Sequence, residues 1–278
     1  MPLVGTDQIV GPARAAGRGV GAFNVIHLEH AEALVEGAAA AGAPVILQIS
    51  ENCVRYHGAL EPIAVATLAV ARSAEVPVAV HLDHAESVDL VHEAVRLGFS
   101  SVMYDGSTLD YEANVARTRE VAEHCHRNGV WVEAELGEVG GKDGVHAPGV
   151  RTNPGEAVEF VEATGVDALA VAVGSSHAML TRDASLDFAL IGDLRAAVPV
   201  PLVLHGSSGV ADPDLAEAVR SGMTKVNIAT QLSKVFTGAV RAYLAENPTT
   251  VDSRKYVAAG RAAVSKEAAR LLEVLGAR

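Results

Sequence analysis

Three features are scarce in this sequence: cysteine, basic residues, and long apolar runs. Cys53 and Cys125 are too few and too far apart for a disulfide framework or a cysteine zinc site. Lys and Arg number 22 against 34 Asp and Glu, and the formal net charge of -12 argues against a nucleic-acid or anionic-membrane partner. No apolar run approaches the roughly 20 residues that cross a bilayer, and the N-terminus lacks a basic segment followed by an apolar one. We therefore expect a cytoplasmic protein that contacts neither nucleic acid nor membrane.

What the sequence does contain is a repeated alternation of short apolar runs and helical patterns. Hydrophobic residues make up 49% of the 278 residues and charged residues 20%, which suits a sizeable buried core. Each apolar run is expected to be a strand. The first run ends at residue 24, and the others span 43–50, 76–82, 100–105, 129–136, 166–173, 201–204 and 223–228. About eight strand-then-helix units predict an α/β fold, a (β/α)8 TIM barrel forming one domain over residues 1–278, with an extra C-terminal helix to residue 275. The alternative is an open doubly wound sheet, which usually has fewer strands at this length.

Polar side chains stand at the C-terminal end of every expected strand. In a TIM barrel these ends meet at one rim, where the active site lies. We therefore expect the following residues to converge: Asn24, Ser50, Asp83, His84, Asp105, Glu135, His177, His205 and Asn227.

Three of these residues are histidines, and each follows an apolar strand: His84, His177 and His205. A polar group at the end of a buried run is costly unless it has a partner. Three imidazoles that leave an open coordination position are typical of catalytic zinc, so we predict that they bind one divalent metal ion. Asp83 either orients a ligand or acts as a general base, and Glu135 is close enough to the rim to touch the metal or a ligand histidine.

Two short loops after the last two strands favour phosphate binding. They are His205-Gly-Ser-Ser-Gly209 and Asn227-Ile-Ala-Thr230, and barrels often bind phosphate at this position through loop N–H groups and a helix N-terminus. The alternative is two tight turns with helix caps. A rival for the chemistry is Lys225, because a lysine amine can form a Schiff base with a carbonyl substrate, but no second lysine stands near a strand end to lower its pKa.

At these residues the chain resembles the class II, zinc-dependent ketose-bisphosphate aldolases, in the short branch that contains fructose- and tagatose-bisphosphate aldolases. The resemblance runs from Ala22-Phe-Asn24 to the last helical pattern. Its most specific motifs are His81-Leu-Asp-His84, Ser101-Val-Met-Tyr-Asp-Gly-Ser107, Val132-Glu-Ala-Glu-Leu-Gly137, Gly174-Ser-Ser-His177, His205-Gly-Ser-Ser-Gly209 and Val226-Asn-Ile-Ala-Thr230.

The resemblance implies a role for each candidate residue. One Zn²⁺ per subunit would be held by His84, His177 and His205, with Glu135 as an alternative or outer ligand. Asp83 would be the acid/base on the C4 hydroxyl. Residues implied to line the substrate pocket are Asn24, Ser50 and Asn227, and those implied to cradle the phosphate, with a monovalent cation (Na⁺ or K⁺), are Gly206, Ser208 and Thr230. Arg254 matches an arginine that reaches the distal phosphate from a partner subunit, which implies a homodimer or homotetramer.

Several positions depart from the family's pattern. Ala178 and Thr181 replace a usual Gly and Lys, and Ala229 stands where an acidic residue is common. In the long loop after the fifth strand, Asp143 matches the lid acid that moves the proton at the ketone's alpha carbon, with His146 as a substitute. These departures leave the aldolase scaffold intact and bear on substrate choice and phosphate binding.

By resemblance, the expected activity is reversible cleavage of a ketose 1,6-bisphosphate into dihydroxyacetone phosphate and glyceraldehyde 3-phosphate, within glycolysis or related carbohydrate metabolism. Fructose 1,6-bisphosphate is the first candidate, and tagatose 1,6-bisphosphate or another phosphorylated ketose is the alternative. Two less favoured readings are a metal-dependent barrel hydrolase and a non-catalytic sugar-phosphate binding protein.

Overall fold

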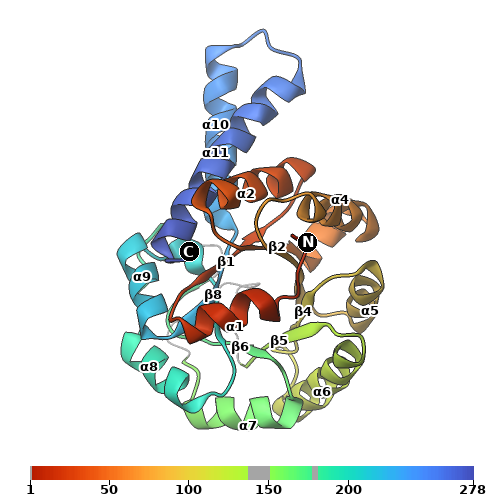
Figure 1. The fold of residues 1–278 in the computed structure, drawn as a ribbon, viewed down its shortest axis with the longest axis vertical. Coiled ribbons are helices and arrows are strands. Elements are labelled where there is room, and N and C mark those ends of the chain that lie inside the picture. The colour runs from red at the N-terminus through yellow and green to blue at the C-terminus, as the bar shows by residue number, and fades with distance from the viewer. Residues whose placement is uncertain (1, 137–150, 177–180) are drawn as a thin grey trace.

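The computed structural model describes residues 2–136, 151–176 and 181–278 and contains a closed barrel of parallel strands (Figure 1). The strands pair in sequence order, and the last pairs with the first. They are β1 (Val20–Asn24), β2 (Val45–Ser50), β3 (Val78–Ala85), β4 (Ser101–Tyr104), β5 (Trp131–Glu135), β6 (Ala168–Ala170), β7 (Leu202–Leu204) and β8 (Met223–Ile228). The predicted (β/α)8 TIM barrel is confirmed, and the open-sheet alternative is wrong.

Helices surround the barrel and cover the strands. Those that follow strands are α2 (Leu28–Ala41), α3 (Glu51–His57), α4 (Glu61–Arg72), α5 (Val88–Leu97), α6 (Tyr111–Arg127), α7 (Pro154–Thr164), α8 (Phe188–Ala197), α9 (Asp212–Ser221) and α10 (Thr230–Glu246). The predicted extra C-terminal helix is α11 (Ser253–Val274), and a 3-10 turn, η1 (Ser207–Gly209), follows β7. Among the described residues no helix is both long and apolar enough to cross a membrane.

Helix α1 (Asp7–Ala15) was not expected from the sequence, and it closes the N-terminal end of the barrel (Figure 1). Its buried side chains pack on small and apolar side chains of the first three strands. This cluster consists of Ile9, Val10, Ala13, Val20, Ala22, Ile46 and Ala79. The opposite end of the barrel, at the C-terminal ends of the strands, therefore remains the one where a substrate can enter.

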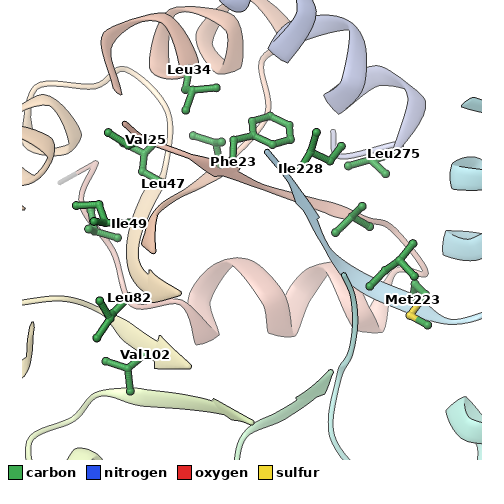
Figure 2. Packing of buried hydrophobic residues seen from close by; sticks show 14 of the residues in the cluster. Phe23, Val25, Leu34, Leu47, Ile49, Leu82, Val102, Met223, Ile228 and Leu275 are labelled. Atoms are coloured by element: carbon green, nitrogen blue, oxygen red, sulfur yellow. The ribbon is translucent and has the colours of Figure 1, made fainter. Parts of the chain in front are cut away.

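Alternation along each strand separates an apolar set of side chains from a polar one. Phe23, Leu47 and Leu82 belong to the large hydrophobic core, where Leu34 of α2 also lies (Figure 2). Because successive strand residues point to opposite faces, their neighbours face the barrel interior. These interior positions include Asn24, Gln48, Asp83, Glu133, Glu135, Lys225 and Asn227. The fold thus gathers polar side chains inside the barrel.

Helices α10 and α11 form a hairpin whose far end projects away from the barrel (Figure 1). Its base packs on α2, where a Cβ on Gly37 would lie 2.4 Å from the carbonyl oxygen of Ser265. Gly37 therefore permits a close approach that any larger residue would block. The residues at the tip of the hairpin have no barrel surface of their own chain beneath them.

Candidate active site

A cavity of about 570 Å³ opens at the C-terminal ends of the strands. It is lined by many of the residues that the sequence singled out: Asn24, Ser50, Asp83, His84, Gly206, Ser208, Asn227 and Thr230. These residues come from β1, β2, β3, β8 and from the loops after β7 and β8. The structure therefore brings together side chains that lie more than 200 residues apart in the sequence.

His84 occupies a strained position at the end of β3. Its φ of 49° makes it the one described non-glycine residue with a positive φ, and the pairing of β3 with β4 shifts register between Leu82 and Ala85. Such strain persists only where surrounding contacts hold it, and it is frequent at functional sites. His84 Nδ1 lies 2.8 Å from Asp105 Oδ2, so a metal would be bound through Nε2.

His205 is fully buried between two glutamates of β5. Its Nε2 lies 3.0 Å from Glu133 Oε1, and its Nδ1 lies 3.2 Å from Glu135 Oε2. Burial alone would lower the pKa of His205, but hydrogen bonds to the two carboxylates raise it to about 9. The His205 ring centroid is 4.7 Å from that of His84. The two imidazoles therefore lie close enough for one ion to contact both.

Two overlapping groups of donor atoms fit a metal ion. Asp83, His84 and His205 each offer an atom within 4.8 Å of the others, and so do His84, Asp105 and Glu135. Imidazole nitrogens with carboxylate oxygens form the donor set that zinc accepts. Glu135 belongs to the second group, and its role as an alternative or outer ligand stays a prediction.

The charges around these donors also favour a cation. Four carboxylates are buried here, on Asp83, Asp105, Glu133 and Glu135, whereas Lys225 is the one buried Lys or Arg in the described part of the chain. Uncompensated buried charge is costly. A dication would offset the excess negative charge, so the residues present fit a divalent metal.

Lys225 is placed differently from a Schiff-base lysine. Its Nζ lies 2.8 Å from Glu133 Oε2 and donates to Asn227 Oδ1 over 2.8 Å, and the side chain is fully buried. Burial would raise the pKa of Glu133, but Lys225 and the hydrogen bond from His205 hold it well below its usual range. Lys225 therefore neutralises Glu133 beneath His205, and this geometry disfavours attack of its amine on a substrate.

The loops after β7 and β8 form one wall of the cavity. Gly206 has a φ of 66°, and a Cβ there would lie 2.6 to 2.8 Å from backbone atoms of Ser176, so only glycine fits. Ser208 Oγ accepts a hydrogen bond from the backbone N–H of Gln231 in the first turn of α10. Thr230 begins that helix, whose N-terminal N–H groups favour an anion.

Several predicted residues are not gathered here. His177, Ala178, Asp143 and His146 lie outside the described residues. Arg254 lies in the first turn of α11, at the tip of the projecting hairpin, with its side chain 90% exposed and paired with Asp252. Within its own chain Arg254 does not line the cavity.

Other residues of the site were assigned no role from the sequence. Asp105, which orients His84, was noticed only as a polar residue at a strand end. Gln48 donates to Asn24 Oδ1 over 2.7 Å, and its place two residues before Ser50 on the same strand face could have identified it. Arg55 lines the cavity from α3 and pairs with Glu51 at 2.7 Å. It was missed because α3 was not predicted.

The backbone strain at His84 gives a testable stability difference. We expect His84→Gly to be more stable than His84→Ala by about 1 kcal/mol, because a Cβ is disfavoured at positive φ. The measurement is the urea midpoint of each variant. At Ala134, an ordinary strand position of β5, glycine should instead be the less stable residue. Equal urea midpoints for His84→Gly and His84→Ala would contradict the claim that the backbone at His84 is strained.

Comparisons with known proteins find relatives over nearly the whole chain. A family model described as fructose-bisphosphate aldolase class-II matches residues 4–278. The YdjI aldolase from Escherichia coli K12 is 32% identical with a TM-score of 0.85, over 99% of this chain and 98% of that chain. A putative fructose-1,6-biphosphate aldolase from Coccidioides immitis is 26% identical with a TM-score of 0.86, over 98% and 96%. The fructose-bisphosphate aldolase from Campylobacter jejuni, at 23% identity and a TM-score of 0.79 over 99% and 96%, shares the fold.

Proposed function

This chain belongs to the class-II fructose-bisphosphate aldolase family, and from that premise we propose that it is a zinc-dependent lyase acting on a ketose 1,6-bisphosphate. Its principal substrate is fructose 1,6-bisphosphate, cleaved reversibly into dihydroxyacetone phosphate and glyceraldehyde 3-phosphate. The observation that carries the proposal is the cluster of Asp83, His84 and His205 donor atoms within 4.8 Å, beside a cavity with a phosphate-type loop.

In this proposal the metal is held by His84 Nε2 and His205 Nδ1, with His177 as the third imidazole and Glu135 as an alternative or outer ligand. Asp105 and Glu133 hold the other nitrogens of the two described histidines, which fixes the ring orientations. When bound, the metal supplies a Lewis acid for the negative charge that develops as the C3–C4 bond breaks.

Asp83 accepts the proton of the C4 hydroxyl during cleavage and returns it during condensation. Burial would raise the pKa of Asp83, but the charges of His84, Lys225 and neighbouring histidines lower it, so the carboxylate is available as a base. Asn227 Nδ2 donates to Asp83 Oδ1 over 3.3 Å and orients it. Transfer of the proton at the ketone's alpha carbon is assigned to Asp143, with His146 as the substitute.

The substrate is positioned by two sets of groups. The phosphate of the dihydroxyacetone half lies against Gly206, Ser208 and Thr230, where loop N–H groups, a hydroxyl and the N-terminus of α10 favour an anion, assisted by a monovalent cation. Asn24 and Ser50 contact the sugar hydroxyls on the opposite side. A cavity of about 570 Å³ lies within the usual size range of small-molecule sites and is large enough for a six-carbon sugar chain with two phosphates.

Arg254 is assigned to contact the distal phosphate of a substrate bound in a neighbouring subunit. It lies at the end of a hairpin that projects from the barrel (Figure 1) and does not line the cavity of its own chain, which supports a role in a site on another chain. The enzyme is accordingly proposed to be a homodimer or homotetramer.

Arg254→Ala should raise the KM for a ketose 1,6-bisphosphate by about tenfold or more, because a charge-assisted contact to phosphate is lost. The KM for the corresponding ketose 1-phosphate should not change, since it has no distal phosphate. Arg117→Ala, at another exposed arginine, serves as the control. Equal effects of Arg254→Ala on both substrates would refute the assignment.

The experiment that tests the proposed function is an assay of triose-phosphate release from several ketose phosphates, including fructose and tagatose 1,6-bisphosphate. Aldol cleavage releases dihydroxyacetone phosphate, whereas a hydrolase would release inorganic phosphate and no triose. Binding without turnover would favour a non-catalytic protein. Borohydride added with substrate should not inactivate the enzyme, because no Schiff base forms.

A further inference from the structure

A second cavity, of about 280 Å³, opens at the N-terminal end of the barrel, far from the active site in the fold. It lies between the end of α1, α8, α9 and the start of β8, and it shares no lining residue with the first cavity. Four arginines line it: Arg14, Arg18, Arg195 and Arg220. Its lining contains no Asp or Glu, although the chain as a whole carries a net charge of -12.

Two of these arginines are held near each other without a carboxylate between them. Arg14 donates to the backbone carbonyl oxygens of Val198 and Pro199. Arg195 forms no side-chain hydrogen bond or ion pair with any described residue, and burial together with the charge of Arg195 lowers the pKa of Arg14. Like charges placed so are repulsive, and an anion between them would relieve the repulsion.

The geometry of the cavity is fixed by packing. A Cβ on Gly222 would lie 2.5 Å from the Cβ and 2.7 Å from the Cγ of Arg195, so the arginine stem rests directly on the glycine backbone. The Nε atoms of Arg14 and Arg18 are buried and have no hydrogen-bond partner. Buried donors normally have partners, so these two arginines are held in place at some cost, and the guanidinium groups that line the cavity are suited to phosphate oxygens.

The remaining arginines are partly compensated. Arg18 donates to the carbonyl oxygen of Arg278, and Arg220 pairs with Glu217 on the same helix. Ser221 and Thr224 add hydroxyl groups to the lining. A volume of about 280 Å³ lies just below the range of small-molecule sites, roughly 300–1,000 Å³. The occupant is therefore a compact anion rather than a bulky cofactor.

We propose that this cavity binds a small anion that carries a phosphate or pyrophosphate group, at a site separate from the active site. Recognition comes from the guanidinium of Arg195, which has no partner among the described residues, from the positive charges of Arg14 and Arg18, and from the hydroxyl groups of Ser221 and Thr224. The site does not depend on the aldolase reaction.

Calorimetric titration of the full-length protein with inorganic pyrophosphate at low ionic strength tests the proposal. The titration is done in a Ser208→Ala background, which weakens binding at the active-site phosphate loop. Arg195→Gln should weaken binding by about tenfold or more, because a charge-assisted contact is lost. Arg220→Gln, at an exposed position, should also weaken it. The matched control is Arg117→Gln, which removes an exposed arginine with the same i,i+3 glutamate pair.

Pyrophosphate binding that is weakened by Arg195→Gln and Arg220→Gln but not by Arg117→Gln supports the site. Three outcomes would overturn it: no binding in the Ser208→Ala background, the same affinity in Arg195→Gln, or an equal loss in Arg117→Gln. Aldolase turnover of Arg195→Gln should match the parent protein. Loss of the proposed aldolase activity would leave these binding results unaffected, so the two proposals fail separately.

Discussion

Replacement of Asp83 by Asn is expected to lower kcat for ketose-bisphosphate cleavage by about 10²- to 10⁴-fold, the usual contribution of a positioned general base. Asn keeps the shape of the side chain but cannot accept the C4 hydroxyl proton. The metal should stay bound, because the imidazoles and the carboxylates that orient them are unchanged. The measurement is steady-state kinetics together with the zinc content of the purified variant.

A partial reaction separates a catalytic loss from a structural one. Exchange of the alpha-carbon proton of dihydroxyacetone phosphate with solvent involves no C4 hydroxyl, so Asp83→Asn should retain it. Asp89→Asn, at an exposed position in the first turn of α5, is the control and should behave as the parent protein. Cleavage by Asp83→Asn at the parent rate would show that the base is misassigned.

Removal of the metal is expected to have the largest effect on activity. Treatment with a chelator should abolish triose-phosphate release, because no described side chain replaces a Lewis acid beside Asp83. Addition of zinc should restore the activity. Activity that survives complete removal of bound metal would exclude the metal-dependent mechanism and favour a Schiff-base mechanism at Lys225.

The fold was largely predictable because its strands are buried and its helices amphipathic. The predicted bounds of β8, 223–228, coincide with the observed ones. Helix α1 was missed because it is short and contains Gly11 and Pro12, both unfavourable inside a helix. Helix α3 is shorter still, and its polar residues resemble a loop.

The end of β3 shows where apolar patterning stops being informative. The strand was expected to end at Leu82, but it continues through Asp83 and His84 to Ala85 across a register shift. A hydrophobicity pattern does not detect this continuation, because the added residues include polar side chains. The positive φ of His84 depends on contacts with other strands, and no local pattern predicts it.

The convergence of the site was predictable, whereas its supporting contacts were not. Strand ends meet at one rim in any barrel, so Asp83 and His205 could be placed together from the sequence. The pairing of Asp105 with His84, and of Glu133 with both His205 and Lys225, depends on barrel register. The arginines of the second cavity come from three helices and a loop, which no periodicity links.

The account depends most directly on His84 and His205 as ligands of one divalent ion. The decisive measurement is the zinc content per chain of His84→Ala and His205→Ala, with Asp83→Asn prepared in parallel. The account predicts about one zinc per chain in the parent protein and in Asp83→Asn, and strongly reduced zinc in both histidine variants. Zinc content equal to the parent's in His84→Ala and His205→Ala would contradict it.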